Sequence, residues 1–135
     1  PDACFIHIHR DPAETIPSIC SLTSQVRKGF TDHTDLNELG KKTLDFWENS
    51  KQKNEAQKNK LNNDQYMDIY YDDFIKSPLQ TIEAIYANFN FSFDEKIKGL
   101  VEFNIEKSVK THKEKHIYTL EEYGLDKKEV HNRLQ

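Results

Sequence analysis

Apolar and polar positions along the chain predict alternating strands and helices. Residues 3–9 are apolar on both alternating faces, as in a strand that is covered on both sides. Residues 11–14 supply an N-cap, a proline at the first helical position and a capping-box glutamate, so we expect a helix from there to about Gly29. Helical periodicity continues over 35–62, and a second strand is expected at 66–71. This order predicts a parallel βαβ unit.

The last half of the chain predicts three more elements and a basic loop. Residues 77–80 form a capping-box pattern ahead of an amphipathic helix. A further helix is expected over 94–109, with Leu100 on the stripe that it buries. Beyond the basic loop, Gly124 is expected to stop a short turn before a last helix. The fold class is therefore an α/β domain with a parallel sheet, mostly helical in these residues.

The strand at 3–9 needs more cover than the chain supplies. Two strands cannot form a doubly covered sheet that buries both of its faces. We therefore expect the remaining strands to come from outside these 135 residues or from a partner, and we expect self-association through the incomplete sheet. The chain also enters its first apolar run directly. These points predict that residues 1–135 are the C-terminal part of a single domain.

Composition and charge narrow the classes of function. With 36% apolar and 31% charged residues, the chain is typical of soluble globular proteins. Its net charge of −4 argues against a nucleic-acid partner, because phosphate neutralisation needs a basic excess. No apolar run reaches the roughly eighteen residues of a membrane span. Cys4 and Cys20 lie in apolar contexts and are interpreted as core residues, and the lack of a secretion signal predicts a cytoplasmic location.

An arginine and a serine at the first strand–helix junction form a candidate anion site. Arg10 follows the strand at its carboxyl end, where open α/β sheets bind ligands, and Ser18 lies on the next helix. The planar guanidinium matches a phosphate, and the hydroxyl adds a further donor. Two alternatives stay open from the residues alone: a surface ion pair for Arg10 and a packed helix hydroxyl for Ser18.

Three blocks of sequence resemble one enzyme family. Residues 10–12, with Ser18 eight positions after the arginine, look like the 3′-phosphate-binding motif of sulfotransferases that use 3′-phosphoadenosine 5′-phosphosulfate (PAPS). Residues 70–78 resemble the family's tyrosine-acidic-acidic-apolar stretch with its following proline. Residues 116–125 resemble the C-terminal segment of a bacterial-type branch. The resemblance implies an incomplete P-loop-type, sulfotransferase-like α/β domain.

The resemblance also implies which residues bind the donor. In the family the arginine and the serine contact the 3′-phosphate, the tyrosine lies near the adenine, and basic residues of the later loop add positive charge. The basic loop could equally be a solvated face, which is the usual role of a lysine cluster. The implied binding residues for PAPS, or for its product adenosine 3′,5′-bisphosphate, are Arg10, Ser18, Tyr71, Lys113, Lys115 and His116.

The activity implied for the complete protein is transfer of a sulfuryl group from PAPS to a hydroxyl or amine of a small-molecule acceptor, without a metal. In the family, the phosphate loop for the 5′-phosphosulfate and the catalytic base both precede the arginine strand. Neither segment occurs in this sequence, so we assign no catalytic residue here. We expect the upstream phosphate-loop portion to be absent and this chain alone to be inactive.

Two other functions compete with this interpretation. The first is a metal hydrolase, because His7 and His9 share one strand face and His112 and His116 have i,i+4 spacing. The sequence places no carboxylate partner beside them. The second is a non-catalytic interaction module in which the long helix over 35–62 is the docking surface.

Overall fold

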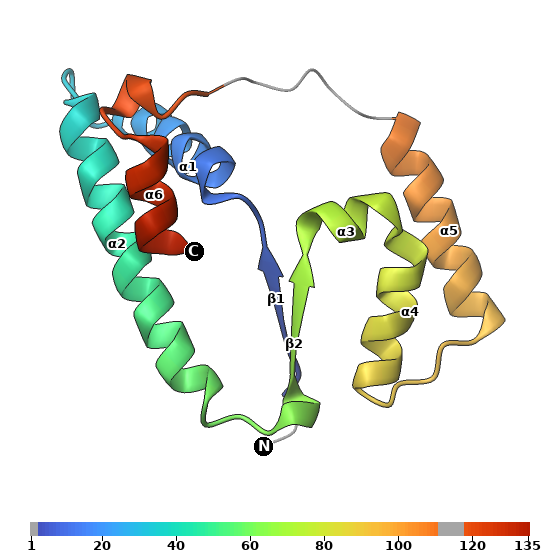
Figure 1. The fold of residues 1–135 in the computed structure, drawn as a ribbon. Helices are drawn as coiled ribbons and strands as arrows, with labels where there is room; N and C mark the ends of the chain where they lie inside the picture. The colour runs from blue at the N-terminus through green and yellow to red at the C-terminus, as the bar shows by residue number, and fades with distance from the viewer. Residues whose placement is uncertain (1–2, 111–117) are drawn as a thin grey trace. The chain divides into compact units, whose positions relative to one another are not determined.

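The computed structural model describes residues 3–110 and 118–135, which fold as two compact units (Figure 1). The first unit contains residues 3–10 and 60–110. The second contains residues 11–59 and 118–135. The chain first passes from one unit to the other between Arg10 and Asp11, directly after the first strand, and it returns between residues 59 and 60.

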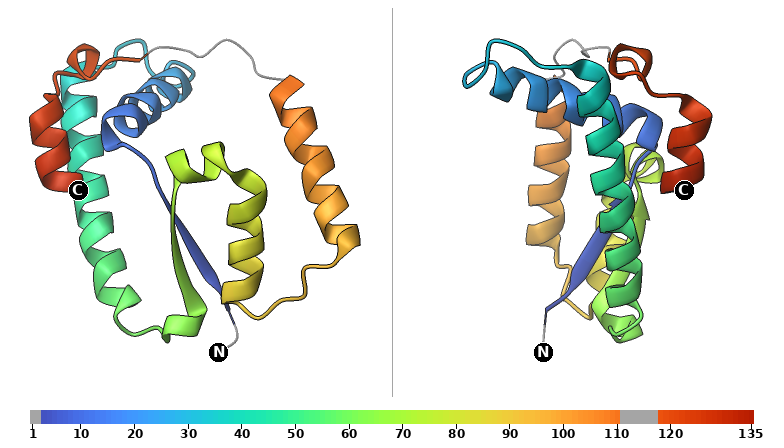
Figure 2. Two further views of the ribbon diagram at one scale, coloured as in Figure 1. Left: turned by 45° about the vertical axis from the view of Figure 1, so that its right-hand side comes forward. Right: turned by 90° about the vertical axis from the view of Figure 1, so that its left-hand side faces the viewer.

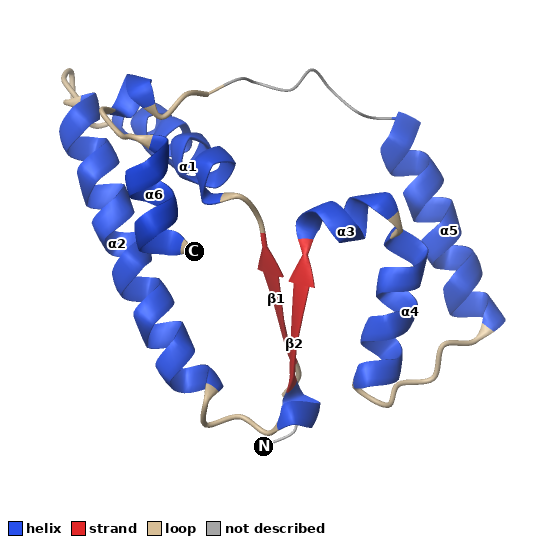
Figure 3. Cartoon of the chain, viewed as in Figure 1, coloured by secondary structure: helices blue, strands red, loops and turns tan. Residues whose placement is uncertain are grey.

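A two-stranded parallel sheet forms the centre of the first unit. β1 (Phe5–His9) pairs with β2 (Tyr66–Tyr70), and the two arrows in Figure 3 point the same way. The predicted parallel βαβ connection is thus confirmed, with each strand shorter than expected. Because side chains alternate along a strand, the pairing of His7 with Asp68 puts both on the same face.

The second strand ends one residue earlier than predicted. Tyr71 was expected inside the strand over 66–71, but it is the first residue of a short helix, α3 (Tyr71–Lys76), which the sequence analysis did not predict. Two acidic residues, Asp72 and Asp73, lie in its first turn, where negative charge stabilises the amino end of a helix. The apolar spacing of this segment fits either structure, so the helical outcome was not evident from periodicity.

The junction of α3 with α4 (Pro78–Asn88) corrects another prediction. The capping box expected at residues 77–80 is not formed, because the Ser77 side chain makes no cap hydrogen bond. Ser77 ends one helix and begins the next: its N–H donates to the Asp73 carbonyl, and its own carbonyl accepts from the N–H of Thr81. Serving both helices fixes its backbone at φ −143° and ψ 64°, and the proline at the first helical position then starts α4.

The first unit closes with α5 (Glu95–Lys110), which lies beside α4 (Figure 2). Ile97, Val101 and Ile105 form one stripe of this helix and are half-buried. Leu100 was expected on the same buried stripe, but 56% of its surface is exposed. The α4–α5 contact is narrow, so it covers only part of the apolar stripe. A short 3-10 turn, η1 (Asn63–Gln65), leads into β2.

The second unit is helical and has a closed core. It contains α1 (Pro12–Arg27), α2 (Leu36–Lys58), a 3-10 turn η2 (Glu121–Tyr123) and α6 (Lys127–Leu134). Asp11, Asp35 and Asp126 cap the three α-helices by accepting backbone N–H bonds at their amino ends. The buried core residues are Ile16, Cys20, Leu39, Leu44, Leu120, Tyr123, Leu125 and Val130.

Two glycines allow a turn and a close approach within the second unit, and an arginine links two of its helices. Gly124 adopts φ +64°, so the predicted stop at this residue is confirmed, and Gly40 lies directly against Tyr123 of η2. A Cβ at Gly40 would lie 2.1 Å from the Tyr123 carbonyl oxygen. Arg133 of α6 donates to Asp45 at 2.6 Å and to Glu48 at 3.0 Å, both on α2.

The two cysteines differ in burial. Cys20 is fully buried in the second unit, as expected, and burial raises the pKa of its thiol. Cys4 is exposed in the first unit, so its interpretation as a core residue is wrong for the structure described. No helix within the described ranges is both long and apolar enough to cross a membrane.

Candidate functional site

The carboxyl ends of β1 and β2 bring two of the predicted donor-binding residues together. Because His9 pairs with Tyr70, the residues that follow them, Arg10 and Tyr71, leave neighbouring strands at the same edge (Figure 1). The Arg10 guanidinium carbon lies 4.5 Å from the centre of the Tyr71 ring. This is cation–π contact, which contributes about 0.5–1 kcal/mol at an exposed site. The Tyr71 ring thus contacts Arg10, the residue for which the sequence predicts anion binding.

This edge is where open parallel sheets bind their ligands. In such sheets, backbone groups at the strand ends are available to a ligand. The helices that follow the strands also place the partial positive charge of their amino ends there. Arg10 is exposed and Tyr71 is half-buried. An exposed guanidinium held against a tyrosine can present its planar fork of donors to a phosphate without first being ordered.

Ser18 belongs to the second unit. It is exposed on α1, two turns after the N-cap Asp11, while its neighbours Ile16 and Pro17 are buried. The alternative of a packed helix hydroxyl is therefore wrong for Ser18 in the described structure. Its exposure on a regular, capped helix makes the hydroxyl accessible to a ligand.

The acidic neighbour of Arg10 is engaged within the second unit. The Asp11 carboxylate accepts the Ala13 N–H at 2.8 Å and lies 2.8 Å from His131 Nε2. Burial raises the pKa of this carboxyl, but the hydrogen bonds from His131 and Ala13 and the positive charge of Lys127 outweigh it, so the pKa lies below its usual value. Asp11 stays ionised as a helix cap.

Three further predicted residues, Lys113, Lys115 and His116, lie outside the described residues, as does His112 of the rival histidine pair. The other rival pair does come together. His7 and His9 lie on β1 with ring centres 4.2 Å apart, and Asp68 of β2 lies 2.7 Å from His9 Nε2. The sequence analysis missed this carboxylate, and only the strand register could have placed it.

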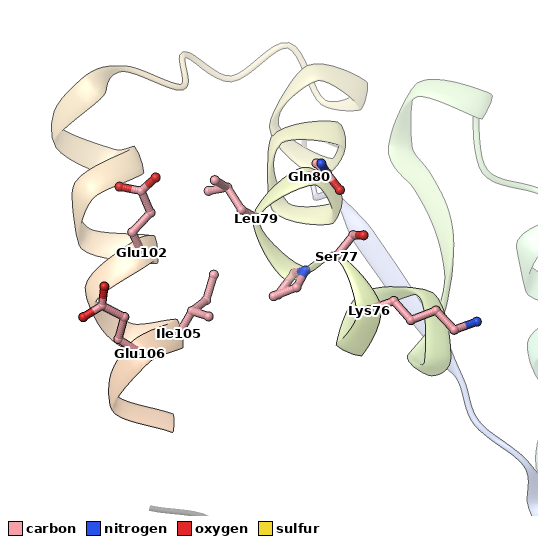
Figure 4. A pocket seen from close by; sticks show the side chains of 8 residues that line it. Lys76, Ser77, Leu79, Gln80, Glu102, Ile105 and Glu106 are labelled. Carbon is pink, nitrogen blue, oxygen red and sulfur yellow. The ribbon is translucent and has the colours of Figure 1, made fainter. Parts of the chain in front are cut away.

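The first unit has a cavity of about 650 Å³ between the α3–α4 junction and α5. Figure 4 shows the carboxylates of Glu102 and Glu106 on one side of it, while Lys76 extends away from them. Lys76 instead lies 3.8 Å from Asp73. Glu102 and Glu106 both line this cavity, and their negative charges make it unsuitable for a phosphate or sulfate.

Comparison with known proteins identifies the family. A family model described as "Sulfotransferase family" matches residues 1–95, which include Arg10, Ser18 and Tyr71. The chain belongs to the sulfotransferase family. Among solved structures, this sulfotransferase chain matches the crystal structure of the sulfotransferase STF1 from Mycobacterium tuberculosis H37Rv, with a TM-score of 0.78 and 26% identity. The match covers 99% of this chain and 33% of that one.

A second solved structure supports the fold alone. The sulfotransferase STF9 from Mycobacterium avium matches with a TM-score of 0.79 and 18% identity, over 93% of this chain and 33% of that one. This sulfotransferase chain therefore spans about a third of the length of the structures that it matches. A search among curated proteins finds no match. The predicted sulfotransferase-like α/β fold, incomplete and mostly helical in these residues, is confirmed.

Proposed function

We propose that this chain supplies the 3′-phosphate and adenine side of the donor site in a sulfotransferase that uses PAPS. The complete enzyme would transfer a sulfuryl group from PAPS to a hydroxyl or amine of a small-molecule acceptor and release adenosine 3′,5′-bisphosphate. The observation that carries the proposal is the position of Arg10, held by Tyr71 at the carboxyl edge of the parallel sheet. The family match over the same residues supports it.

Each residue has a distinct part in this proposal. Arg10 forms charge-assisted hydrogen bonds to the 3′-phosphate oxygens, and the exposed hydroxyl of Ser18 donates another from α1. Tyr71 positions Arg10 with one ring face, so the adenine would meet the opposite face or the ring edge. Lys113, Lys115 and His116 would add positive charge from the later loop. No metal takes part in this donor site.

Transfer of the sulfuryl group would depend on positioning and on stabilising charge at the transferring oxygens, as in phosphoryl transfer. The residues assigned here hold the end of the donor that does not react. We therefore propose that this chain binds the donor nucleotide and does not by itself catalyse transfer. Its binding energy would serve catalysis by fixing the donor in the complete site.

The proposal is tested by nucleotide selectivity. Adenosine 3′,5′-bisphosphate and ADP have similar charge, but only the first carries a 3′-phosphate. We expect calorimetric titration to show tighter binding of the bisphosphate. The Arg10→Ala variant should lose roughly ten- to hundredfold in affinity for it, the size of one or two hydrogen bonds to a charged group. ADP binding should change little.

A matched variant separates specific recognition from general charge. Arg27→Ala removes an exposed arginine from the last turn of α1 and should leave the preference for the bisphosphate intact. Arg10→Lys keeps the charge but loses the planar fork, so we expect it to fall between the wild type and Arg10→Ala. Equal, weak binding of both nucleotides that ignores Arg10 would overturn the proposal and favour an interaction module.

A further inference from the structure

One face of the β1–β2 sheet carries polar, metal-ligating side chains where a covered sheet normally carries apolar ones. His7 and His9 alternate on β1, and Asp68 lies opposite His7 on β2. The other face of the same strands is apolar, with Ile8 paired to the buried Ile69. The polar face is therefore a local departure from the pattern of the sheet, confined to a few neighbouring positions.

The ligand atoms of these three residues converge. The Asp68 carboxylate oxygen lies 2.7 Å from His9 Nε2 and 3.7 Å from His7 Nδ1. One ligand atom from each residue lies within 4.8 Å of the others. In a tetrahedral zinc site with bonds of about 2.0–2.1 Å, ligand atoms are separated by roughly 3.3 Å. Shifts of about half an ångström in the two distances from Asp68 would bring them to that value.

We propose that His7, His9 and Asp68 bind a divalent transition-metal ion, for which Zn²⁺ is the natural probe. Two imidazoles and one carboxylate are a donor set that suits such ions, and three protein ligands leave a position for water. With neutral histidines the site carries one negative charge, which favours a cation. All three side chains are between 30% and 42% exposed, so an ion can reach them from solvent.

Neighbouring aromatic residues fix the two imidazoles. The Tyr66 hydroxyl lies 2.8 Å from His7 Nδ1, and the His9 ring stacks on Tyr70 with centroids 5.1 Å apart. In the tautomer where His7 Nδ1 accepts from this hydroxyl, the lone pair is on the nitrogen that lies 3.7 Å from the Asp68 carboxylate oxygen. The metal would take this lone pair in place of the hydroxyl proton, and the stacked Tyr70 ring would hold His9 in position.

A bound ion would join β1 to β2 near their carboxyl ends. Arg10 and Tyr71 are the residues that directly follow these two strands. Its role would be structural, because it connects two strands that share only one short ladder among the described residues. The competing account is a hydrogen-bonded His–Asp–His network that needs no ion. The two accounts differ in stoichiometric metal affinity. This inference does not depend on the proposed function, since nucleotide binding is measured separately.

Metal binding is tested on the chain after treatment with a chelator. Calorimetric titration with Zn²⁺ near neutral pH should show one equivalent bound with micromolar or tighter affinity. Co²⁺ should bind to the same site and give the visible absorption bands of a nitrogen- and oxygen-ligated ion. We expect His9→Ala and Asp68→Asn each to weaken binding by roughly tenfold or more. The melting temperature should rise with Zn²⁺ in the wild type and rise less, or not at all, in these two variants.

Two control variants make the result decisive. His33→Ala removes an exposed loop histidine and should leave the affinity unchanged. A His112→Ala/His116→Ala double variant addresses the other histidine pair and should also retain binding. Circular dichroism of each metal-free variant establishes that it is folded, and Asp68→Asn keeps the shape of the side chain. Absence of stoichiometric binding, or binding lost only in the double variant, would overturn the proposal.

Discussion

The two units of this chain differ in how completely they bury their apolar residues. In the second unit, eight core residues from α1, α2, α6 and the segment around η2 are each at most 7% exposed. In the first unit, Ile69 and Phe89 are buried, whereas Phe5, Ile6 and Ile8 of β1 are about half exposed. The helical unit therefore buries its apolar residues within itself. The two-stranded sheet has apolar residues typical of a strand covered on both faces, but several of them stay exposed in these residues.

An apolar cavity shows the same contrast within the first unit. A hollow of about 550 Å³ between α4 and α5 is lined mainly by apolar side chains, including Ile82, Tyr86 and Leu100. Interiors of folded proteins normally contain few voids larger than a water molecule. Side chains in the core of the second unit should therefore stabilise the fold more than those around this hollow. Paired substitutions measure the difference as a change in the free energy of unfolding.

The largest expected effect is loss of a side chain from the closed core. Leu44 is fully buried in α2, so Leu44→Ala should lower the free energy of unfolding by about 2–5 kcal/mol. The matched change Leu100→Ala in α5 removes a side chain that lines the hollow but is 56% exposed, so it should lower this free energy by less than about 1 kcal/mol. Urea denaturation is followed by fluorescence of Trp47, the single tryptophan and part of α2, for the second unit, and by amide signals of α5 for the first unit. Similar losses for both variants would refute the contrast.

A pair of helical glycines gives a smaller effect with opposite signs. Gly40→Ala would place a methyl group against the Tyr123 backbone, so we expect a loss of about 1–3 kcal/mol in spite of the better helix propensity of alanine. Gly99→Ala in α5 meets nothing within 4 Å and should stabilise its helix by up to about 1 kcal/mol. Native-state hydrogen exchange of the α2 and α5 amides measures both. A gain at Gly40 would show that α2 and η2 can separate without cost.

The smallest effect concerns the pH dependence of the second unit. The folded-state pKa of Asp11 is lowered, so its contribution to stability is present above the unfolded pKa of about 3.9 and is lost as the pH falls through the folded value. Asp11→Asn keeps an N-cap but loses the charge, and should cost about 0.2–1 kcal/mol near neutral pH. The gap between the variant and the wild type should close below about pH 4.

The control for this prediction is Asp35→Asn. Asp35 caps α2 through the N–H groups of Asn37 and Glu38, so this change removes a cap charge without touching the contact between Asp11 and His131. Stability is followed by urea denaturation at several pH values. An Asp11→Asn gap that persists unchanged in acid would mean that the charge of this carboxylate does not stabilise the unit.

Local signals in the sequence predicted most of the elements. Strong caps and periodicity identified the helices that begin after Asp11 and Asp35, and Gly124 marked a real turn with positive φ. The short helix α3 was missed, because its apolar spacing also fits a strand and its length is below that of a periodic helix. Ser77 was assigned a cap that it does not form, because the pattern ignores the helix that ends at the same residue.

For the candidate site, the sequence predicted individual residues but not which of them are in contact. Arg10 and Tyr71 were each assigned to the donor, but their contact follows from the register of two strands that are about sixty residues apart in the chain. The same register brings Asp68 beside the two histidines. Pairing between distant strands is set by the whole sheet rather than by local spacing, so no motif in the sequence contains it.

The most direct test of the donor-site account is an amide chemical-shift titration with adenosine 3′,5′-bisphosphate, compared residue by residue with ADP. The account predicts that the bisphosphate shifts the amides of Arg10, Ser18 and Tyr71 more than ADP does, with little change around Glu102 and Glu106. Equal shifts with both nucleotides, or shifts that avoid the strand ends and gather elsewhere, would contradict it.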